Sequence, residues 1–331
     1  MSAFTIHYDS IQEGHWFKKL YPKLEAAELH PFPSKGKGGE HLARVLAYDR
    51  PDIVLTDHDE PILVVERTVE VPSGHNVGQR FARLAAAAQL QVPCVYFGPY
   101  AAYKHGGSTQ GPRYMNLRLF YAIEKMAAIE RAASTTVNWP VDGHYEIIKS
   151  ASKDTRMRAY MNLFFENYRR GELVQLNNVL QSSQFEQEQQ AERLSFIESD
   201  VENPEQYDSP PDSVSILPTA EFKARFGVSS GQLPLEKTVV YNVGMTYVRS
   251  DPYTGMAILY SYLYCGGMGK HSSHLILHFP HITRAIWDAA AKNPRRKDVR
   301  LFLAVADGII FGRSYAGIHT LRRSVRAGIV L

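Results

Sequence analysis

Two short apolar runs, each bordered by an acidic residue, constrain the fold of this chain most strongly. Asp52 directly precedes the run 53–55, and Glu66 directly follows the run 62–65. The polar segment 56–60 between the runs predicts a turn, so the two runs are expected to form an antiparallel β-hairpin. Asp52 and Glu66 then lie side by side at one end of that hairpin. Two adjacent carboxylates oppose each other's ionisation, and a cation between them relieves the repulsion.

The alternation of side chains along residues 62–70 places Glu66 and Thr68 on the same face of the sheet. Glu66 follows four apolar residues, and burying an acid there is costly unless the acid is paired or bound to metal. Two interpretations are open. Glu66 pairs with Arg80 or Arg83, or it ligates a hard cation such as Mg²⁺, which prefers carboxylate oxygens. A bound Mg²⁺ lowers the pKa of a water molecule and neutralises charge on a phosphate.

The elements expected around the hairpin are typical of an α/β protein. Residues 40–49 predict a short helix, residues 77–91 predict an amphipathic helix, and residues 92–97 predict a strand that Gly98 and Pro99 end. A right-handed crossover would pair this last strand in parallel with the second strand of the hairpin. The sequence therefore predicts an α/β core with a central mixed β-sheet flanked by helices.

Changes in composition divide the chain into three parts. Residues 1–180 are expected to form the domain that contains the hairpin, with a mostly helical extension from residue 113. Residues 181–218 are rich in Gln, Glu, Asp and Pro and predict an exposed helix followed by a polar linker. Residues 219–331 are expected to form a C-terminal α+β domain. Within it the pattern predicts a helix at 220–226, strands at 239–249 and 256–265, a helix at 281–292, and strands at 299–306 and 309–313.

Composition limits the classes of protein to which the chain can belong. The net charge of +3 permits nucleic acid as a partner but does not indicate it. The two cysteines, Cys94 and Cys265, predict neither a disulfide framework nor a cysteine-based zinc site. We see no signal peptide at the N-terminus and no run long enough to span a bilayer. A cytoplasmic protein that does not associate with membranes is therefore expected.

The segment 38–100 resembles the PD-(D/E)xK nuclease superfamily, which includes most type II restriction endonucleases. The order of elements around the acidic pair makes the resemblance more specific than the short motif alone. The residues that carry it are Pro51-Asp52, Glu66-Arg67-Thr68, Glu40 in the preceding helix, and Gln79-Arg80 in the following helix.

The resemblance implies a restriction-endonuclease-like core in which Asp52 and Glu66 ligate Mg²⁺. Glu40 would assist them, directly or through a water molecule. The chain departs from the family pattern at Thr68, which occupies the position of the usual lysine. Threonine hydrogen-bonds water but carries no charge, so a cation from elsewhere would be needed. Arg80 is the best candidate for that cation.

Lys104 and Lys37 are further candidates to replace the family lysine. Gln79 would hydrogen-bond a phosphate or the attacking water. By resemblance, the chain is expected to be a Mg²⁺-dependent endonuclease that hydrolyses DNA phosphodiester bonds, of the type II site-specific kind. Double-stranded DNA is then the partner, and a homodimer is expected because twofold symmetry matches palindromic sites. The C-terminal domain would read DNA or dimerise.

Two other hypotheses remain. Because Thr68 replaces lysine, the protein could keep the fold as a catalytically weak or inactive DNA-binding or accessory protein. The four histidines His271, His274, His278 and His281 raise the third hypothesis, a metal enzyme centred on them. If residues 275–279 form a strand, only His274 and His278 share a face. A strand at 256–265 would likewise place Tyr260, Tyr262 and Tyr264 on one face.

Overall fold

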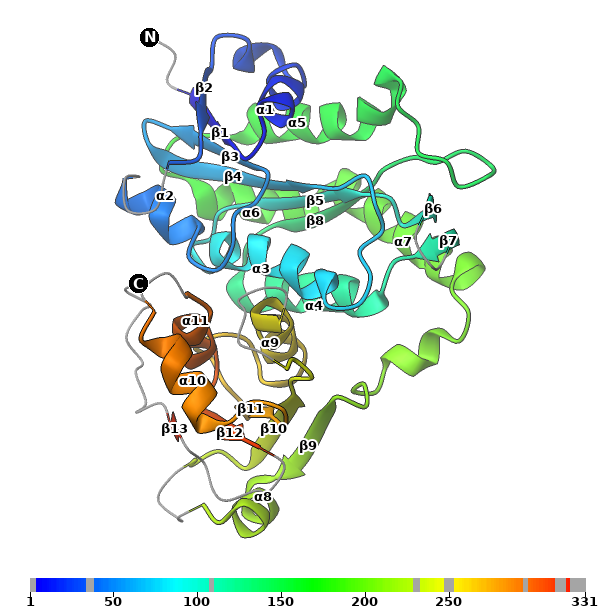
Figure 1. Ribbon diagram of the computed structural model, residues 1–331. Coiled ribbons are helices and arrows are strands. Elements are labelled where there is room, and N and C mark those ends of the chain that lie inside the picture. Colours follow the sequence, from blue (N-terminus) through cyan, green and yellow to red (C-terminus); the bar gives the residue numbers. More distant parts are fainter. Residues whose placement is uncertain are drawn as a thin grey trace. The chain divides into compact units, whose positions relative to one another are not determined.

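The structure of the protein is a computed structural model (Figure 1), in which the chain divides into two compact units. The first unit comprises Met1–Ser73 and Arg83–Pro204, and the second comprises Gly74–Ala82 and Glu205–Leu331. The boundaries expected from composition lay at residues 181 and 218. The structure describes residues 4–33, 39–106, 110–228, 233–246, 253–293, 297–312 and 320–321.

A six-stranded mixed sheet forms the centre of the first unit, with strand order β2-β1-β3-β4-β5-β8. The hairpin strands β3 and β4 are antiparallel, whereas β4, β5 and β8 run parallel to one another. This arrangement confirms the predicted α/β class with a mixed sheet. The strands are β1 (Phe4–Tyr8), β2 (Glu28–Pro31), β3 (Ile53–Asp57), β4 (Glu60–Arg67), β5 (Cys94–Gly98) and β8 (Ser134–Asn138). A separate pair consists of β6 (Ala101–Lys104) and β7 (Gly111–Tyr114).

Helices cover both faces of this sheet (Figure 1). One apolar core joins the strands to α1, α5 and α6 through buried residues such as Phe17, Phe164 and Leu180. In Figure 1, α4 lies on the opposite side of the sheet from α5. The helices are α1 (Ile11–Lys18), α2 (Glu40–Val45), α3 (Asn76–Gln89), α4 (Leu117–Glu130), α5 (Thr155–Asn167), α6 (Leu173–Ser182) and α7 (Gln184–Asp200), with 3₁₀ turns η1 (Pro22–Leu24), η2 (Ala151–Asp154) and η3 (Pro204–Tyr207).

The second unit contains a five-stranded sheet with order β13-β12-β11-β10-β9, in which β10, β11 and β12 are parallel. Its α8 packs on one face of the sheet, where Phe222 and Phe226 meet Ile276 and Ile310 in a small apolar core. The elements are β9 (Val214–Pro218), α8 (Thr219–Phe226), β10 (Lys237–Asn242), α9 (Tyr253–Tyr264), β11 (His274–Phe279), α10 (Arg284–Ala291), α11 (Lys297–Val305), β12 (Gly308–Phe311) and β13 (Thr320–Leu321).

The elements predicted around the acidic pair are confirmed. The hairpin appears as β3 and β4 with Ile53 opposite Val65. The predicted short helix, amphipathic helix and strand correspond to α2, α3 and β5. The parallel pairing of the last strand is also confirmed, with Glu66 of β4 opposite Tyr96 of β5.

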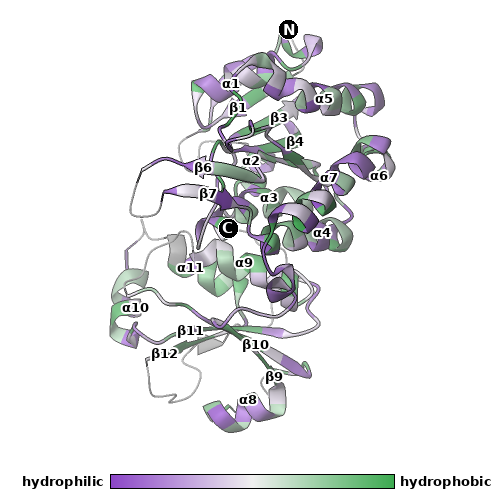
Figure 2. Ribbon diagram, turned by 90° about the vertical axis from the view of Figure 1, so that its right-hand side faces the viewer, coloured by the Kyte–Doolittle hydropathy of each residue, from purple (hydrophilic) through white to green (hydrophobic). Residues whose placement is uncertain are grey.

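The strand predicted at 256–265 is wrong, because this segment belongs to the helix α9. Every residue of α9 from Tyr253 to Leu263 is buried, and Figure 2 colours this helix from near white to green. A helix that is buried on all sides lacks an apolar stripe, so its period cannot be distinguished from that of a buried strand. Tyr260 therefore stacks on Tyr264, one helical turn away, with ring centroids 5.8 Å apart.

Other segments also differ from the prediction. The expected strand at 299–306 is mostly α11, and the expected strand at 239–249 ends at Asn242 in the described residues. The N-terminal strands β1 and β2, of which β2 lies at the edge of the sheet, were not predicted, and neither was the pair β6 and β7. The segment 181–218, expected to be a helix and a linker, contains α7 and then β9, which pairs with β10. Of these strands, β1 pairs with β3, which is distant in sequence, so its formation depends on tertiary context. No helix in the described part of the chain has the length and apolar character required to cross a membrane.

Within the second unit, Gly78 and Gly255 allow two backbones to approach closely. A Cβ atom at Gly78 would overlap the backbone nitrogen of Met256, and one at Gly255 would overlap the backbone of Gly78. Gly244, in contrast, has no neighbouring atom within 4 Å of the position of such a Cβ. Substituting alanine at Gly255 therefore forces the packed backbones apart.

We expect Gly255→Ala to lower the free energy of unfolding by about 1–3 kcal/mol, as overpacking does in other proteins. The matched control Gly244→Ala is expected to change it by less than about 0.5 kcal/mol. Urea unfolding followed by circular dichroism measures both values. Equal stabilities for the two variants would contradict the close backbone contact.

Candidate active site at the end of the hairpin

The two acids predicted from the sequence converge on a single cation. Asp52 directly precedes β3, and Glu66 is the penultimate residue of β4, one position beyond the paired Ile53 and Val65. Asp52 is 6% exposed and Glu66 is fully buried. The Arg83 Nη1 atom lies 2.9 Å from Glu66 Oε1 and 3.7 Å from Asp52 Oδ1. The antiparallel register thus brings the carboxylates to either side of one nitrogen.

Arg83 extends from α3 and also forms an ion pair with Asp49. Its Nε atom lies 3.2 Å from Asp49 Oδ2. Burial lowers the pKa of the Arg83 guanidinium, but the charges of Glu66, Asp49 and Asp52 outweigh burial and raise that pKa above its ordinary value. Arg83 is therefore permanently charged. It was one of the two arginines that the sequence suggested as an ion-pair partner for Glu66, and the structure shows that ion pair.

The Asp52 carboxyl is held in an environment that favours its neutral form. Burial, followed by the charges of Glu66 and Glu13, raises the pKa of Asp52 to about 8. The backbone N–H of Arg67, which donates to Asp52 Oδ2 at 2.6 Å, and the charge of Arg83 oppose this shift without cancelling it. Near neutral pH, a further positive charge beside Asp52 would therefore be needed to hold it fully ionised.

The side chain of Thr68, at the position of the family's usual lysine, is hydrogen-bonded within the turn that follows β4. Its side chain is buried, and its Oγ1 donates to the carbonyl oxygen of Glu70 at 3.0 Å and accepts the Glu70 N–H at 3.2 Å. The hydroxyl therefore closes the turn after β4. Orienting a water molecule, the role that the resemblance suggested for this position, would require this local pair to open.

The structure does not bring Glu40 together with the acidic pair. Glu40 begins α2 and is exposed. Among the described residues, no group of three or more His, Cys, Asp or Glu side chains is placed to hold a metal ion. A role for Glu40 as a direct third ligand thus has no support in this geometry.

The remaining residues expected from the resemblance are Gln79 and the cations Arg80, Lys104 and Lys37. Gln79 and Arg80 belong to the part of α3 that groups with the second unit. Lys104 ends β6 and is exposed, and Lys37 lies outside the described residues. Asp49 and Glu13, which also act on the acidic pair, were not predicted from the sequence. The sequence signal for Asp49 is its position three residues before Asp52. The signal for Arg83 is its position one helical turn after Arg80.

Arg67 fixes the end of β4 from the opposite face of the sheet. Its guanidinium lies 4.6 Å from the ring of Trp16 and 4.9 Å from the ring of Trp139, and both indoles stack on Phe97. Asp154 accepts the Trp16 indole N–H at 2.8 Å. This aromatic cluster holds the Arg67 backbone, and with it the N–H that binds Asp52.

The histidines form no metal cluster in the described part of the chain. As predicted, residues 275–279 are in a strand, β11, so that His274 and His278 share a face. His274 Nε2 accepts the N–H of Leu235 at 2.8 Å, and His278 Nε2 lies 3.0 Å from the carbonyl oxygen of Gly312. Each buried ring is therefore held by structural partners of its own.

Comparisons of the chain with family models, curated proteins and solved structures found no match. The chemistry of the site must therefore be judged from its donor set. Asp52 and Glu66 offer hard carboxylate oxygens, and Mg²⁺ is commonly bound by one or two carboxylates with water and substrate phosphate. The buried, mutually repelling pair fits such an ion, and a divalent cation would offset the unfavourable ionisation of Asp52.

The raised pKa of Asp52 predicts a pH-dependent stability. The unfolded chain releases this proton near the ordinary pKa of 3.8, whereas the folded chain retains it until about pH 8. Between these values only the unfolded chain gains from ionising Asp52. The free energy of unfolding therefore falls progressively as the pH rises through this range. We expect Asp52→Asn, which does not titrate, to gain stability relative to wild type by up to about 1.4 kcal/mol per pH unit in this range.

Urea unfolding of both proteins in EDTA, at half-unit steps from pH 5 to pH 8, measures this difference. The chelator keeps divalent cations from altering the ionisation of Asp52. Stability curves that stay parallel over the whole range would show that Asp52 titrates normally in the folded protein.

Proposed function

We propose that the protein is a Mg²⁺-dependent endonuclease that hydrolyses DNA phosphodiester bonds, of the type II site-specific restriction kind. The observation that carries the proposal is the convergence of Asp52 and Glu66 on one cation at the end of the β3–β4 hairpin. The β4-α3-β5 unit beside it, with β4 and β5 parallel, supports a restriction-endonuclease-like core.

In this proposal Asp52 and Glu66 hold Mg²⁺, which when bound supplies an activated water and neutralises charge on the scissile phosphate. The N–H of Arg67 orients Asp52 through its hydrogen bond to Oδ2. Arg83, rather than Arg80, takes the place of the family lysine, because its guanidinium already touches both acids. An arginine is a poor base, so Arg83 positions and screens the phosphate rather than accepting a proton.

The partners follow from the same proposal. Double-stranded DNA is the substrate, and the protein acts in the cytoplasm as a homodimer whose twofold axis matches that of a palindromic site. The second unit reads the DNA or forms the dimer interface. Arg295, Arg296, Arg322 and Arg323 would be candidates to contact DNA phosphates; they lie outside the described residues.

A second candidate is a DNA-binding or accessory protein without catalysis. The observation that favours it is that the charges of Asp52 and Glu66 are already partnered by Arg83, while the Thr68 hydroxyl is engaged in its turn. The ion-pair network would then be structural. The two candidates differ in whether a metal ion ever enters the site.

We expect purified wild type to cleave plasmid DNA with Mg²⁺, and Asp52→Ala or Glu66→Gln to lose at least about 100-fold in rate. Removing a direct metal ligand should exceed the 10–100-fold cost typical of outer-shell partners. The control Glu60→Gln changes an exposed acid, the first residue of β4, and should cleave like wild type. Equal cleavage by wild type and Asp52→Ala would overturn the proposed enzyme.

Arg83→Met gives a test that does not depend on activity. Removing the guanidinium leaves buried carboxylates without their cation, which costs about 3–5 kcal/mol. If the acids can bind Mg²⁺, millimolar Mg²⁺ should restore part of this loss and raise the melting temperature of Arg83→Met more than that of wild type. An equal effect of Mg²⁺ on both proteins would favour the non-catalytic candidate.

A further inference from the structure

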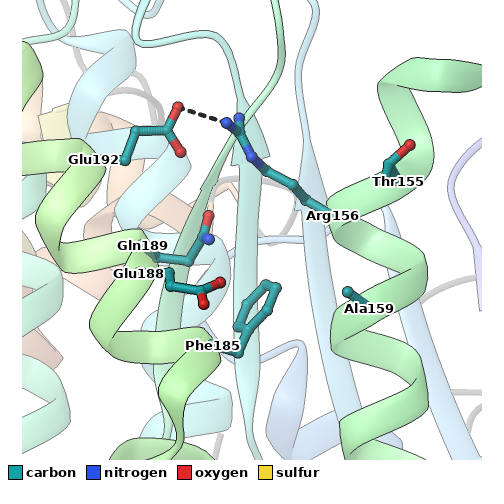
Figure 3. A pocket seen from close by; sticks show the side chains of 7 residues that line it. All are labelled: Thr155, Arg156, Ala159, Phe185, Glu188, Gln189 and Glu192. Atoms are coloured by element: carbon teal, nitrogen blue, oxygen red, sulfur yellow. Dashed lines mark ion pairs between the residues drawn. The ribbon is translucent and has the colours of Figure 1, made fainter.

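A groove between α5 and α7 lies apart from the acidic pair, within the first unit (Figure 3). Its volume is about 390 Å³, near the lower end of the range of small-molecule sites. Helix α5 contributes Thr155, Arg156 and Ala159. Helix α7 contributes Phe185, Glu188, Gln189 and Glu192. The groove is adjacent to Asn138, the last residue of β8, and ligands of α/β proteins commonly bind beyond the carboxyl ends of strands.

Gln189 provides a buried polar group with no partner in the described part of the chain. The residue is 3% exposed, and its Oε1 atom accepts no hydrogen bond from the described residues. Figure 3 shows its amide directed from α7 into the space between the helices, beside the ring of Phe185. A buried carbonyl oxygen without a donor is unfavourable, so a ligand that donates a hydrogen bond there would remove an existing cost.

The guanidinium of Arg156, the strongest hydrogen-bond donor of the groove, already has partners in the protein. Arg156 Nη2 lies 3.0 Å from Glu192 Oε1, and Arg156 Nη1 donates to the carbonyl oxygen of Asn138 at 3.2 Å. The Arg156–Glu192 ion pair bridges the two helices at one end of the groove (Figure 3). The hydroxyl of Thr155 donates to the carbonyl oxygen of Ser152 at 2.9 Å.

The groups that remain for a ligand are mainly acceptors. The lining contains the carboxylates of Glu188 and Glu192 and one guanidinium, so it carries one net negative charge. Glu188 Oε1 accepts from Gln184 Nε2 and Glu192 Oε1 accepts from Asn138 Nδ2, each at 2.8 Å. Gln189 Oε1 and the lone pairs of Thr155 Oγ1 add neutral acceptors. The half-buried ring of Phe185 offers an aromatic face, which attracts organic cations. Together these groups select a positively charged ligand with N–H donors.

We propose that the groove between α5 and α7 binds a small organic cation with several N–H donors, namely an aliphatic amine or guanidinium compound. One N–H donates to Gln189 Oε1, the charge lies near Glu188 and Glu192, and the alkyl part packs on Phe185. The site uses no residue of the acidic pair, so it stands whether or not the protein cleaves DNA.

Isothermal titration of the full chain with agmatine and with spermidine tests the site, and AMP serves as an anionic comparison. We expect saturable binding of a cation and none of AMP. Gln189→Leu removes the amide at similar size, and Glu192→Gln removes one charge. Each variant should weaken binding at least tenfold, whereas Glu198→Gln, an exposed acid on the same helix, should bind like wild type.

Gln189→Leu also separates a lost site from a lost fold. Because it replaces a buried polar group that lacks a partner, its melting temperature should equal or exceed that of wild type. Weak binding by a variant with that melting temperature supports the site. The proposal is overturned if neither cation binds, if AMP binds better, or if Gln189→Leu and Glu192→Gln bind like wild type.

Discussion

A partly buried guanidinium shared by three carboxyl groups holds the end of the central hairpin together. Arg83 contacts Asp49, Asp52 and Glu66, and the last two are almost completely shielded from water. Buried charges without a counter-ion cost several kcal/mol each, so a cation between the acids stabilises the packing of β3, β4 and the second half of α3. A metal ion can supply this positive charge as well as an arginine can, and the proposed nuclease depends on that exchange.

The hairpin and its acidic pair could be predicted because their signals are local. A polar turn between two apolar runs determines the pairing of the strands, and their alternation determines that Asp52 and Glu66 meet. The choice between Arg80 and Arg83 could not be made in this way. It depends on how the helix is rotated against the sheet, which tertiary packing decides. The same limit applies to Glu40, whose distance from the pair depends on where α2 packs.

The errors in the second unit have a different cause. Helix α9 is apolar on all sides, so its sequence carries neither the helical period nor true alternation. The missed strands β1 and β2 are short and obtain their hydrogen bonds from each other and from β3, which is distant in sequence. In each of these cases, tertiary contacts decide the type of the element.

The most direct test of the central claim is anomalous diffraction from crystals of the protein soaked in Mn²⁺, a close substitute for Mg²⁺. The account predicts a single strong peak about 2.1 Å from oxygen atoms of both Asp52 and Glu66, with the Arg83 guanidinium moved from between them. Crystals that show no peak there at high Mn²⁺ concentration, with Arg83 still bridging the two carboxylates, would contradict it.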